Sequence, residues 1–406
     1  MLDIRPILST LHRHKVTAVL LVLEIALTCA IVCNAVFLVR QRLDWMHLNS
    51  GVDEANIVDV RPVNIGDTPD MHARVTETLA ALRDIPGADH VTLSNQIPLG
   101  MESWNSGIKL DPNVAAPAMH VTNYYGEDLL QTLGSGLLEG RDFRPDEYAW
   151  LDDVTIGLKD AVIPHVAIVS QFVSDRLYNG KALGKTVYYD DIPLRIIGVA
   201  RNIVRPNVND RTTTYGSIIL PVRMTEGLGA TYIFHTKPGQ SDEVIKAAVA
   251  TLRKLDPNRV ILSKRHFSEV RDAFFASDRA MTRLLVGVCI ALLIVTALGI
   301  VGLASFWVAQ RRRQIGVRRA LGATRSDVLR YFQTENFLLA TMGIALGMVL
   351  AYGINIVLMV QYELPRLPAT YLPLGAAALW ILGQAAVYAP AHRASRVPPV
   401  EATRGN

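Results

Sequence analysis

Residues 284–325 read LLVGVCIALLIVTALGIVGLASFWVAQRRRQIGVRRALGATR. The first part, Leu284–Ala309, carries no charged side chain and is long enough to cross, as a helix, the roughly 30 Å hydrocarbon core of a bilayer. Arginines follow at once, which is typical of the cytoplasmic end of a membrane helix. The stretch therefore predicts a membrane span that ends in a basic segment inside the cell.

Three more apolar stretches of the chain are also long enough to cross a bilayer. Val16–Val39 is interrupted only by Glu24, and Asn336–Val360 and Leu367–Ala391 carry no charge. The first of the three is longer than the apolar core of a signal peptide, so we predict an uncleaved anchor. Half of the 406 residues are hydrophobic, which fits a membrane protein.

Basic side chains predict the orientation, because the cytoplasmic ends of spans are rich in Lys and Arg. They gather before the first span, between the second and third spans, and after the fourth span. These residues are Arg5, Arg13, Lys15, Arg311, Arg312, Arg313, Arg318, Arg319, Arg325, Arg330, Arg393, Arg396 and Arg404. The opposing arginines at 40, 42, 279 and 283 flank a long region, where the rule is weak. We therefore expect a multi-pass membrane protein with both termini in the cytoplasm.

The predicted organisation is an α+β membrane protein with one span, a large periplasmic domain and then three spans. Its segments are the cytoplasmic N-terminus with the first span (1–40), the periplasmic domain (41–283), the second span (284–309), a cytoplasmic loop (310–335), the third span (336–360), a short periplasmic loop (361–366), the fourth span (367–391) and a cytoplasmic tail (392–406).

The periplasmic region has the pattern of an α+β domain. Short β-branched runs such as His165–Ser170 and Leu194–Val199 predict strands, and Ser241–Leu255 has the apolar stripe of a helix. Residues 100–215 are richer in strand and turn signals than their flanks. We therefore predict a β-rich part inserted into a split α/β part. All three cysteines lie in apolar runs, so this domain is expected to fold without disulfides.

Motifs for chemistry are weak in this region. Gly180–Thr186 resembles a phosphate-binding loop, but it has three residues between its glycines instead of four, and a strand-like run follows. Ser170, His165 and Asp175 are close in sequence only, which does not make a catalytic triad. No His or Cys pair has metal-ligand spacing, and no basic face predicts nucleic-acid binding. We expect no catalytic, metal or cofactor site in this chain.

The basic segment after the second span predicts a short helix–turn–helix at the membrane face. Gly322-Ala-Thr324 interrupts the helical pattern, and Thr324 or Ser326 can cap the helix that leads into the third span. One interpretation is a solvated loop that only orients the protein. The other is a docking element, in which Ala320 and Ala323 let a partner approach closely and apolar side chains fill a groove on it. Those apolar side chains are Ile315, Val317, Leu321 and Val328.

The motif QIGVRRALGATR, residues 314–325, resembles the R-E-I-G-x-R-x-A-[LV]-G-A signature of MacB/FtsX-type ABC permeases. The tail, residues 389–404, is similar to that family's P-A-R-R-A-S-R-x-x-P-x-E-A-L-R ending. Gly140-Arg-Asp-Phe, residues 165–170 and residues 184–199 resemble its periplasmic landmarks. Two departures are Gln314, where the family has an acid, and Thr403 in the ending.

The resemblance implies a permease that works with a separate ABC ATPase dimer, which binds ATP and magnesium, and with a second permease chain of the same or a related kind. The ATPase-coupling loop would comprise Ile315, Gly316, Val317, Arg318, Ala320, Leu321, Gly322, Ala323 and Val328. Family members typically transmit ATP-driven motion to their periplasmic domains, with or without a periplasmic adaptor and an outer-membrane channel. The resemblance also implies a bacterial inner membrane, whose lipid bilayer is the remaining expected partner.

Two features inside the spans have alternative interpretations. Glu24 either meets a polar group of another helix or is a harmless interfacial or protonated residue. Gly343 and Gly347 form a G-x-x-x-G pattern that permits close helix approach, either within the four helices or between two permeases.

Three classes of function follow. The first is a permease subunit for efflux, export or extraction. The second is an FtsX-like regulator of a periplasmic partner such as a cell-wall hydrolase. The third, a membrane-anchored enzyme or sensor, is disfavoured by the absent motifs. The large periplasmic region favours the first.

The orientation is testable with reporter fusions. A fusion at Asp146 should report the periplasm, and fusions at Thr324 and Asn406 should report the cytoplasm, because the arginine-rich segments stay inside. Paired alkaline-phosphatase and fluorescent-protein reporters measure this. A cytoplasmic report at Asp146 would contradict the topology.

Overall fold

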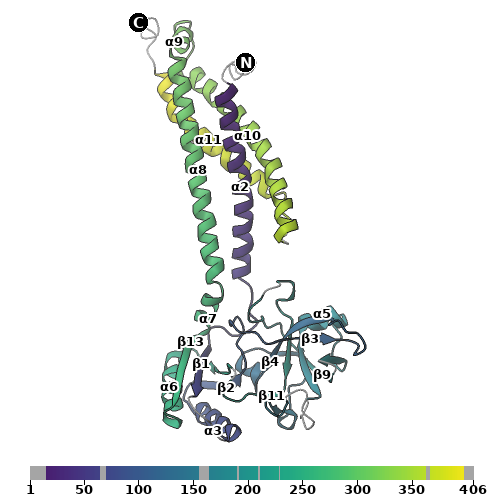
Figure 1. The fold of residues 1–406 in the computed structure, drawn as a ribbon. Helices are drawn as coiled ribbons and strands as arrows, with labels where there is room; N and C mark the ends of the chain where they lie inside the picture. Colours follow the sequence, from purple (N-terminus) through teal and green to yellow (C-terminus); the bar gives the residue numbers. More distant parts are fainter. Residues whose placement is uncertain are drawn as a thin grey trace. The chain divides into compact units, whose positions relative to one another are not determined.

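A computed structural model (Figure 1) describes residues 15–64, 70–154, 164–189, 192–208, 211–227, 229–362 and 366–396. The tail motif beyond residue 396 and the arginines before Lys15 lie outside the described residues. The chain forms two compact units. We name residues 1–47 and 277–406 the membrane unit, and residues 48–276 the extramembrane unit.

Four helices of the membrane unit are long and apolar enough to cross a membrane, which confirms the predicted arrangement of one span and then three. They are α2 (Lys15–Met46), α8 (Ala276–Gln310), α10 (Arg325–Tyr362) and α11 (Tyr371–Ser395). A short helix, α9 (Arg312–Ala320), lies between α8 and α10 in the chain. The core of the bundle forms where α10 packs along α2 and α11, with Ile25, Cys29, Leu339 and Ile344 buried.

Two glycines of α10 bring its backbone against α2. A Cβ at Gly343 would lie 2.8 Å from the Cβ of Ile25, and a Cβ at Gly347 would lie 2.5 Å from the Cβ of Cys29. The latter would also lie 2.7 Å from the carbonyl oxygen of Ala26. Such distances leave no room for a side chain, so both glycines serve packing inside the membrane unit.

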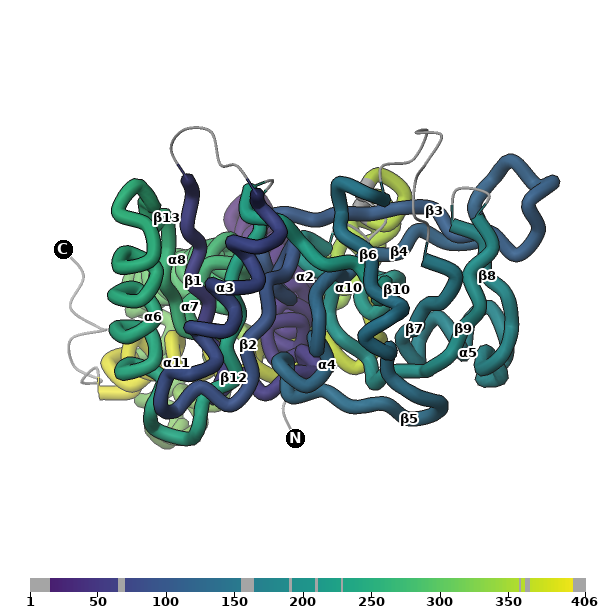
Figure 2. Tube along the Cα trace, turned by 90° about the horizontal axis from the view of Figure 1, so that it is seen from below, coloured from purple at the N-terminus to yellow at the C-terminus, as the bar shows by residue number. Residues whose placement is uncertain are grey.

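The extramembrane unit contains a split α/β part whose four-stranded antiparallel sheet has the order β13-β1-β12-β2. Its strands are β1 (Ile57–Asn64), β2 (Ala88–Ser94), β12 (Thr231–Thr236) and β13 (Arg259–His266). Helices α3 (Met71–Arg83) and α6 (Ser241–Leu255) contact each other and pack on this sheet (Figure 2). The chain therefore builds strand–helix–strand twice, with an insertion between β2 and β12. A further short helix, α7 (Phe267–Phe274), follows β13.

The insertion is β-rich, as predicted, and its main sheet has the order β5-β9-β7-β10-β4-β3-β8. Because β9 also pairs with β8, this sheet closes on itself as a barrel. Its strands are β3 (Asn105–Lys109), β4 (Met119–Tyr125), β5 (Leu137–Gly140), β7 (Val166–Ser170), β8 (Thr186–Tyr189), β9 (Ile192–Ala200) and β10 (Ser217–Leu220). Strands β6 (Ala149–Trp150) and β11 (Val222–Arg223) pair separately, and the short helices are α4 (Leu129–Thr132), α5 (Gln171–Tyr178), η1 (Pro145–Glu147) and η2 (Arg211–Thr213).

The segment that resembles a phosphate-binding loop is a turn before a strand, as predicted. Gly180 and Gly184 both have positive φ, at 78° and 77°, and β8 begins at Thr186. A phosphate-binding loop would open a helix at this point, whereas β8 continues into pairings with β3 and β9.

Buried polar networks fix both places where the chain passes between the α/β part and the barrel. On the way in, the amide of Gln96 donates to the carbonyl oxygen of Asn123 at 2.7 Å and accepts from the backbone of Trp104 at 2.9 Å. The hydroxyl of Ser94 donates to the carbonyl oxygen of Tyr125 at 2.7 Å. These bonds tie the connection from β2 to β3 onto strand β4.

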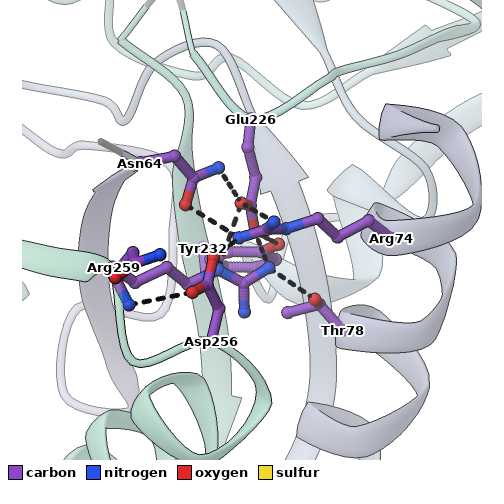
Figure 3. A network of polar contacts seen from close by, with 8 residues as sticks. Asn64, Arg74, Thr78, Glu226, Tyr232, Asp256 and Arg259 are labelled. Atoms are coloured by element: carbon purple, nitrogen blue, oxygen red, sulfur yellow. Dashed lines mark hydrogen bonds and ion pairs between the residues drawn. The ribbon is translucent and has the colours of Figure 1, made fainter. Parts of the chain in front are cut away.

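On the way back, Glu226 lies between β11 and β12 and is almost fully buried (Figure 3). Its carboxylate pairs with the buried Arg259 of β13 at 2.7 Å. Asn64 and Tyr232 donate to the same carboxylate at 2.7 and 2.5 Å. Burial and the nearby Glu226 raise the pKa of Tyr232 well above its usual value, so its hydroxyl remains a donor. The returning chain is thereby held to β1, β12 and β13.

Figure 3 also shows how α3 joins this network. Arg259 donates to the hydroxyl of Thr78 at 2.8 Å, and Arg74 donates to the side-chain oxygen of Asn64 at 3.1 Å. Arg74 also forms an ion pair with Asp256, just after α6. One buried carboxylate thus gathers groups from three strands and a helix.

Glu226→Gln should lower the free energy of unfolding by about 3–5 kcal/mol, because it leaves the buried Arg259 without a counter-charge. Hydrogen–deuterium exchange of amides in β12 and β13, in detergent-solubilised protein, measures the change. Glu102→Gln is the matched control: it removes an exposed pair with Arg61 and should cost less than about 1 kcal/mol. Equal effects of the two variants would contradict the role of Glu226.

Gly347→Ala should lower the melting temperature of the solubilised chain, since the new Cβ overlaps α2. Gly353→Ala on the same helix is the control, because nothing lies within 4 Å of its added Cβ. Helix propensity alone would favour Ala by about 1 kcal/mol at both positions. Differential scanning fluorimetry tests the contrast, and a melting temperature unchanged by Gly347→Ala would refute the close approach.

Candidate functional site

The segment between α8 and α10 is the candidate site, because it is a short helix fixed at both ends by long membrane helices. We name residues 311–324 the α9 loop. Helix α8 ends at Gln310, and α9 begins one residue after Arg311, whose backbone has φ −99° and ψ 11°. The chain then turns at Gly322, where φ is +101°. Only glycine adopts this φ readily, so the sharp turn depends on it.

Thr324 starts the next helix, and Ser326 does not. The backbone N–H of Thr324 donates to the carboxylate of Asp327 at 2.9 Å, and the N–H of Asp327 donates to the Thr324 hydroxyl at 3.2 Å. This reciprocal arrangement satisfies two N–H groups at the first turn of α10. It fixes the point at which the turn ends and the membrane helix begins.

One face of the α9 loop packs against the ends of α10 and α11. Ile315 and Val328 are buried there with Phe332, Ala391 and Ala394. The prediction that Ile315 and Val328 fill a partner's groove is therefore wrong. Ile315 and Val317 are two residues apart, and positions with that spacing point to different sides of a helix, so only one of them can face the bundle.

Polar contacts reinforce the same packing. The Arg318 guanidinium lies 5.0 Å from the centre of the Tyr331 ring, and Arg319 donates to the carbonyl oxygen of Ser395 at 3.1 Å. Gly316 is buried, which allows α9 to lie close to its neighbours. The α9 loop is thus held to α10 and α11.

The opposite face presents small and apolar residues to the outside. Leu321 is 83% exposed and Val317 is 46% exposed, unusually high values for such side chains. Ala320 and Gly322 are exposed beside them, and Ala323 is half-buried. We name Val317, Ala320, Leu321 and Gly322 the tip of the α9 loop. They are the predicted coupling residues that a partner could contact most fully. The exposed arginines at 312 and 313, on the first turn of α9, form the rim of this tip.

Glu24 meets α8 within the membrane unit. Its carboxylate lies against Gly299, where a Cβ would come within 2.6 Å of Oε2. One helical turn away, the hydroxyls of Thr28 and Thr296 are 2.8 Å apart. In the described part of the chain, no side chain donates a hydrogen bond to the Glu24 carboxylate. Glu24 therefore faces α8 at Gly299, and a polar partner for it on another helix remains a prediction.

One further pair has only a weak signal in the sequence. Arg311 belongs to a basic cluster that predicts topology, and Glu335 directly precedes the predicted third span, yet the two form a buried ion pair. The available signal was an acid placed at the edge of an apolar run, where an unpaired charge is costly.

Two family models match the chain: the MacB-like periplasmic core domain over residues 25–252, and the FtsX-like permease C-terminal region over residues 286–399. A relative from Shewanella oneidensis, "Macrolide export ATP-binding/permease protein MacB", is 26% identical over 365 residues, covering 86% of this chain and 52% of the relative. The Escherichia coli protein of the same name is 24% identical, covering 68% and 42%. The chain spans about half the length of the curated relatives it matches.

Among solved structures, the periplasmic region of MacB from Actinobacillus actinomycetemcomitans aligns with a TM-score of 0.34 at 16% identity, over 56% of this chain and 97% of that one. The family assignment rests instead on the two models. The first covers more than half of the chain, and the second covers the α9 loop with the helices on either side of it. The chain therefore belongs to the MacB/FtsX-like permease family.

Proposed function

We propose that this chain is the permease subunit of an ABC transporter and that the α9 loop receives an ATPase subunit. ATP and magnesium would be bound by a separate ATPase dimer, and a second permease chain would complete the complex. The relatives' names combine ATP binding with a permease, which supports the pairing of these two activities. The arginine clusters predict the orientation, in which the α9 loop lies in the cytoplasm and the extramembrane unit lies in the periplasm.

The observation that carries the proposal is the exposed apolar tip of the α9 loop. Val317 of α9 and Leu321, the residue after it, are exposed, while the other face of α9 is packed on α10 and α11. An exposed leucine beside exposed small residues suits a pocket on a protein partner, with the arginine rim around it. Because α9 is continuous in the chain with two membrane helices, a force applied at the tip can move those helices.

Work done by the ATPase would then reach the periplasm as movement of the extramembrane unit. The buried networks at Gln96 and Glu226 favour motion of the α/β part and barrel as one body, because directional buried hydrogen bonds resist bending. We propose that this motion serves efflux, export or extraction of a substrate from the periplasmic side.

Gly322→Val and Leu321→Asp should leave membrane insertion intact, since neither changes a span. Val at φ +101° strains the turn, although nothing lies within 4 Å of the added Cβ. Leu321→Asp places a charge at the proposed contact. Each variant should weaken association with the ATPase by about tenfold or more. Copurification of an ABC ATPase with the tagged chain, and ATP hydrolysis by the complex in nanodiscs, measure the effect.

Arg312→Ala is the control, because this exposed arginine lies on the rim and rim charges contribute little to affinity. It should retain most of the binding and hydrolysis. If both tip variants assembled and hydrolysed ATP normally while Arg312→Ala abolished both, the docking assignment would be wrong.

A further inference from the structure

Arg311 and Glu335 form the most deeply buried ion pair of the described membrane unit, at the root of the α9 loop. One guanidinium nitrogen, Nη1, donates to both carboxylate oxygens, at 2.8 and 3.0 Å. The two side chains are only 7% and 1% exposed. Glu335 belongs to α10, and Arg311 is the single residue between α8 and α9. The pair therefore ties the break between two helices to a third helix.

Further polar groups surround the Arg311–Glu335 pair, but several buried donors there have no hydrogen-bond acceptor within the residues that the structure describes. The Arg311 guanidinium lies 5.4 Å from the centre of the Trp307 ring. Beside the pair, three buried donors have no acceptor among the described residues: Nη2 of Arg311, Nε1 of Trp307 and Nδ2 of Asn336. A cavity of about 10 Å³, room for roughly one water, is lined by Trp307, Glu335 and Asn336 with apolar neighbours.

Such a cluster is a poor way to gain stability. Removing two charges from water is costly, and well-packed apolar residues of similar volume usually stabilise a protein at least as much as a buried ion pair. Unpaired donors increase the cost. Sites that break the rules of stable packing are expected to serve position or function.

We propose that Arg311 and Glu335 are positioning residues that fix the direction of the α9 loop, so that a force on its tip moves α8 and α10 together. The coupling part of this inference rests on the proposed function. The other buried contacts of the packed face are apolar, through Ile315, Val328 and Phe332, and apolar contacts have no preferred direction. The polar contacts of Arg318 and Arg319 reach α10 and α11, so neither of them sets the angle between α8 and α9. The hydrogen bonds from the Arg311 guanidinium to both carboxylate oxygens of Glu335 are directional, so they can hold one angle between α8 and α9.

The test compares two double variants of the full chain in nanodiscs. Arg311→Met/Glu335→Leu replaces the buried pair with apolar side chains of similar volume, which keeps the fold where a single substitution would leave a bare charge. Arg40→Met/Asp44→Leu is the matched control, since it removes an ion pair on α2 whose side chains are 65% and 63% exposed.

The first readout is amide exchange in α9 of the permease alone. Exchange over Arg312–Ala320 should rise at least tenfold in the 311/335 variant, while α2 and the middle of α10 keep wild-type protection. The control should match wild type throughout. Unchanged protection of α9 in a correctly folded 311/335 variant would overturn the positioning role, whatever the ATPase does.

The second readout uses the complex with its ATPase. The 311/335 variant should still bind the ATPase, because the exposed tip is intact, but ATP should no longer alter amide exchange in residues 48–276. An ATP response equal to wild type would overturn the coupling part of the inference. If the wild-type chain bound no ABC ATPase, the proposed function would fail, and the first readout would still decide the positioning role.

Discussion

The close approach of α2 and α10 is the contact on which the membrane unit depends. In lipid there is little hydrophobic drive to bring helices together, so association relies on dense van der Waals packing. Gly343 and Gly347 provide it by letting α10 reach the backbone of α2 near Ala26. Helix α11 packs on both helices, so it takes its place from the same contact. Helix α8, with few buried residues over its apolar stretch, is held more by local polar contacts such as Thr28 with Thr296.

Directional polar groups are found at the junctions of the molecule. Arg311 and Glu335 lie where α8 gives way to α9, and Glu226 with Arg259 lies where the barrel returns to the α/β part. The helix and strand interiors are apolar and close-packed, which fixes volume but leaves relative angles weakly defined. Buried ion pairs define angles at a cost in desolvation. Both pairs thus define an angle at a place where two parts of the chain meet.

The spans were predictable because a bilayer demands long apolar helices, and α6 was predicted with its observed bounds because its apolar stripe repeats with the helical period. Closure of the barrel is not predictable from the sequence, because the pairing of β8 with β9 and β3 depends on the register between distant strands. The sequence motif locates the candidate site, but the sequence does not reveal that Ile315 and Val328 face the bundle and not a partner. The pairing of Arg311 with Glu335 required the turn between them to be known in three dimensions.

The closed barrel limits how the extramembrane unit can meet other proteins. A strand at an open sheet edge offers unpaired N–H and C=O groups that another chain can extend. Between β3, β8 and β9 those groups are already used within the unit. A partner on that side must recognise side chains and shape, without borrowing a strand. Contacts of this kind can form and part repeatedly without breaking any sheet, which suits the cyclic motion proposed above.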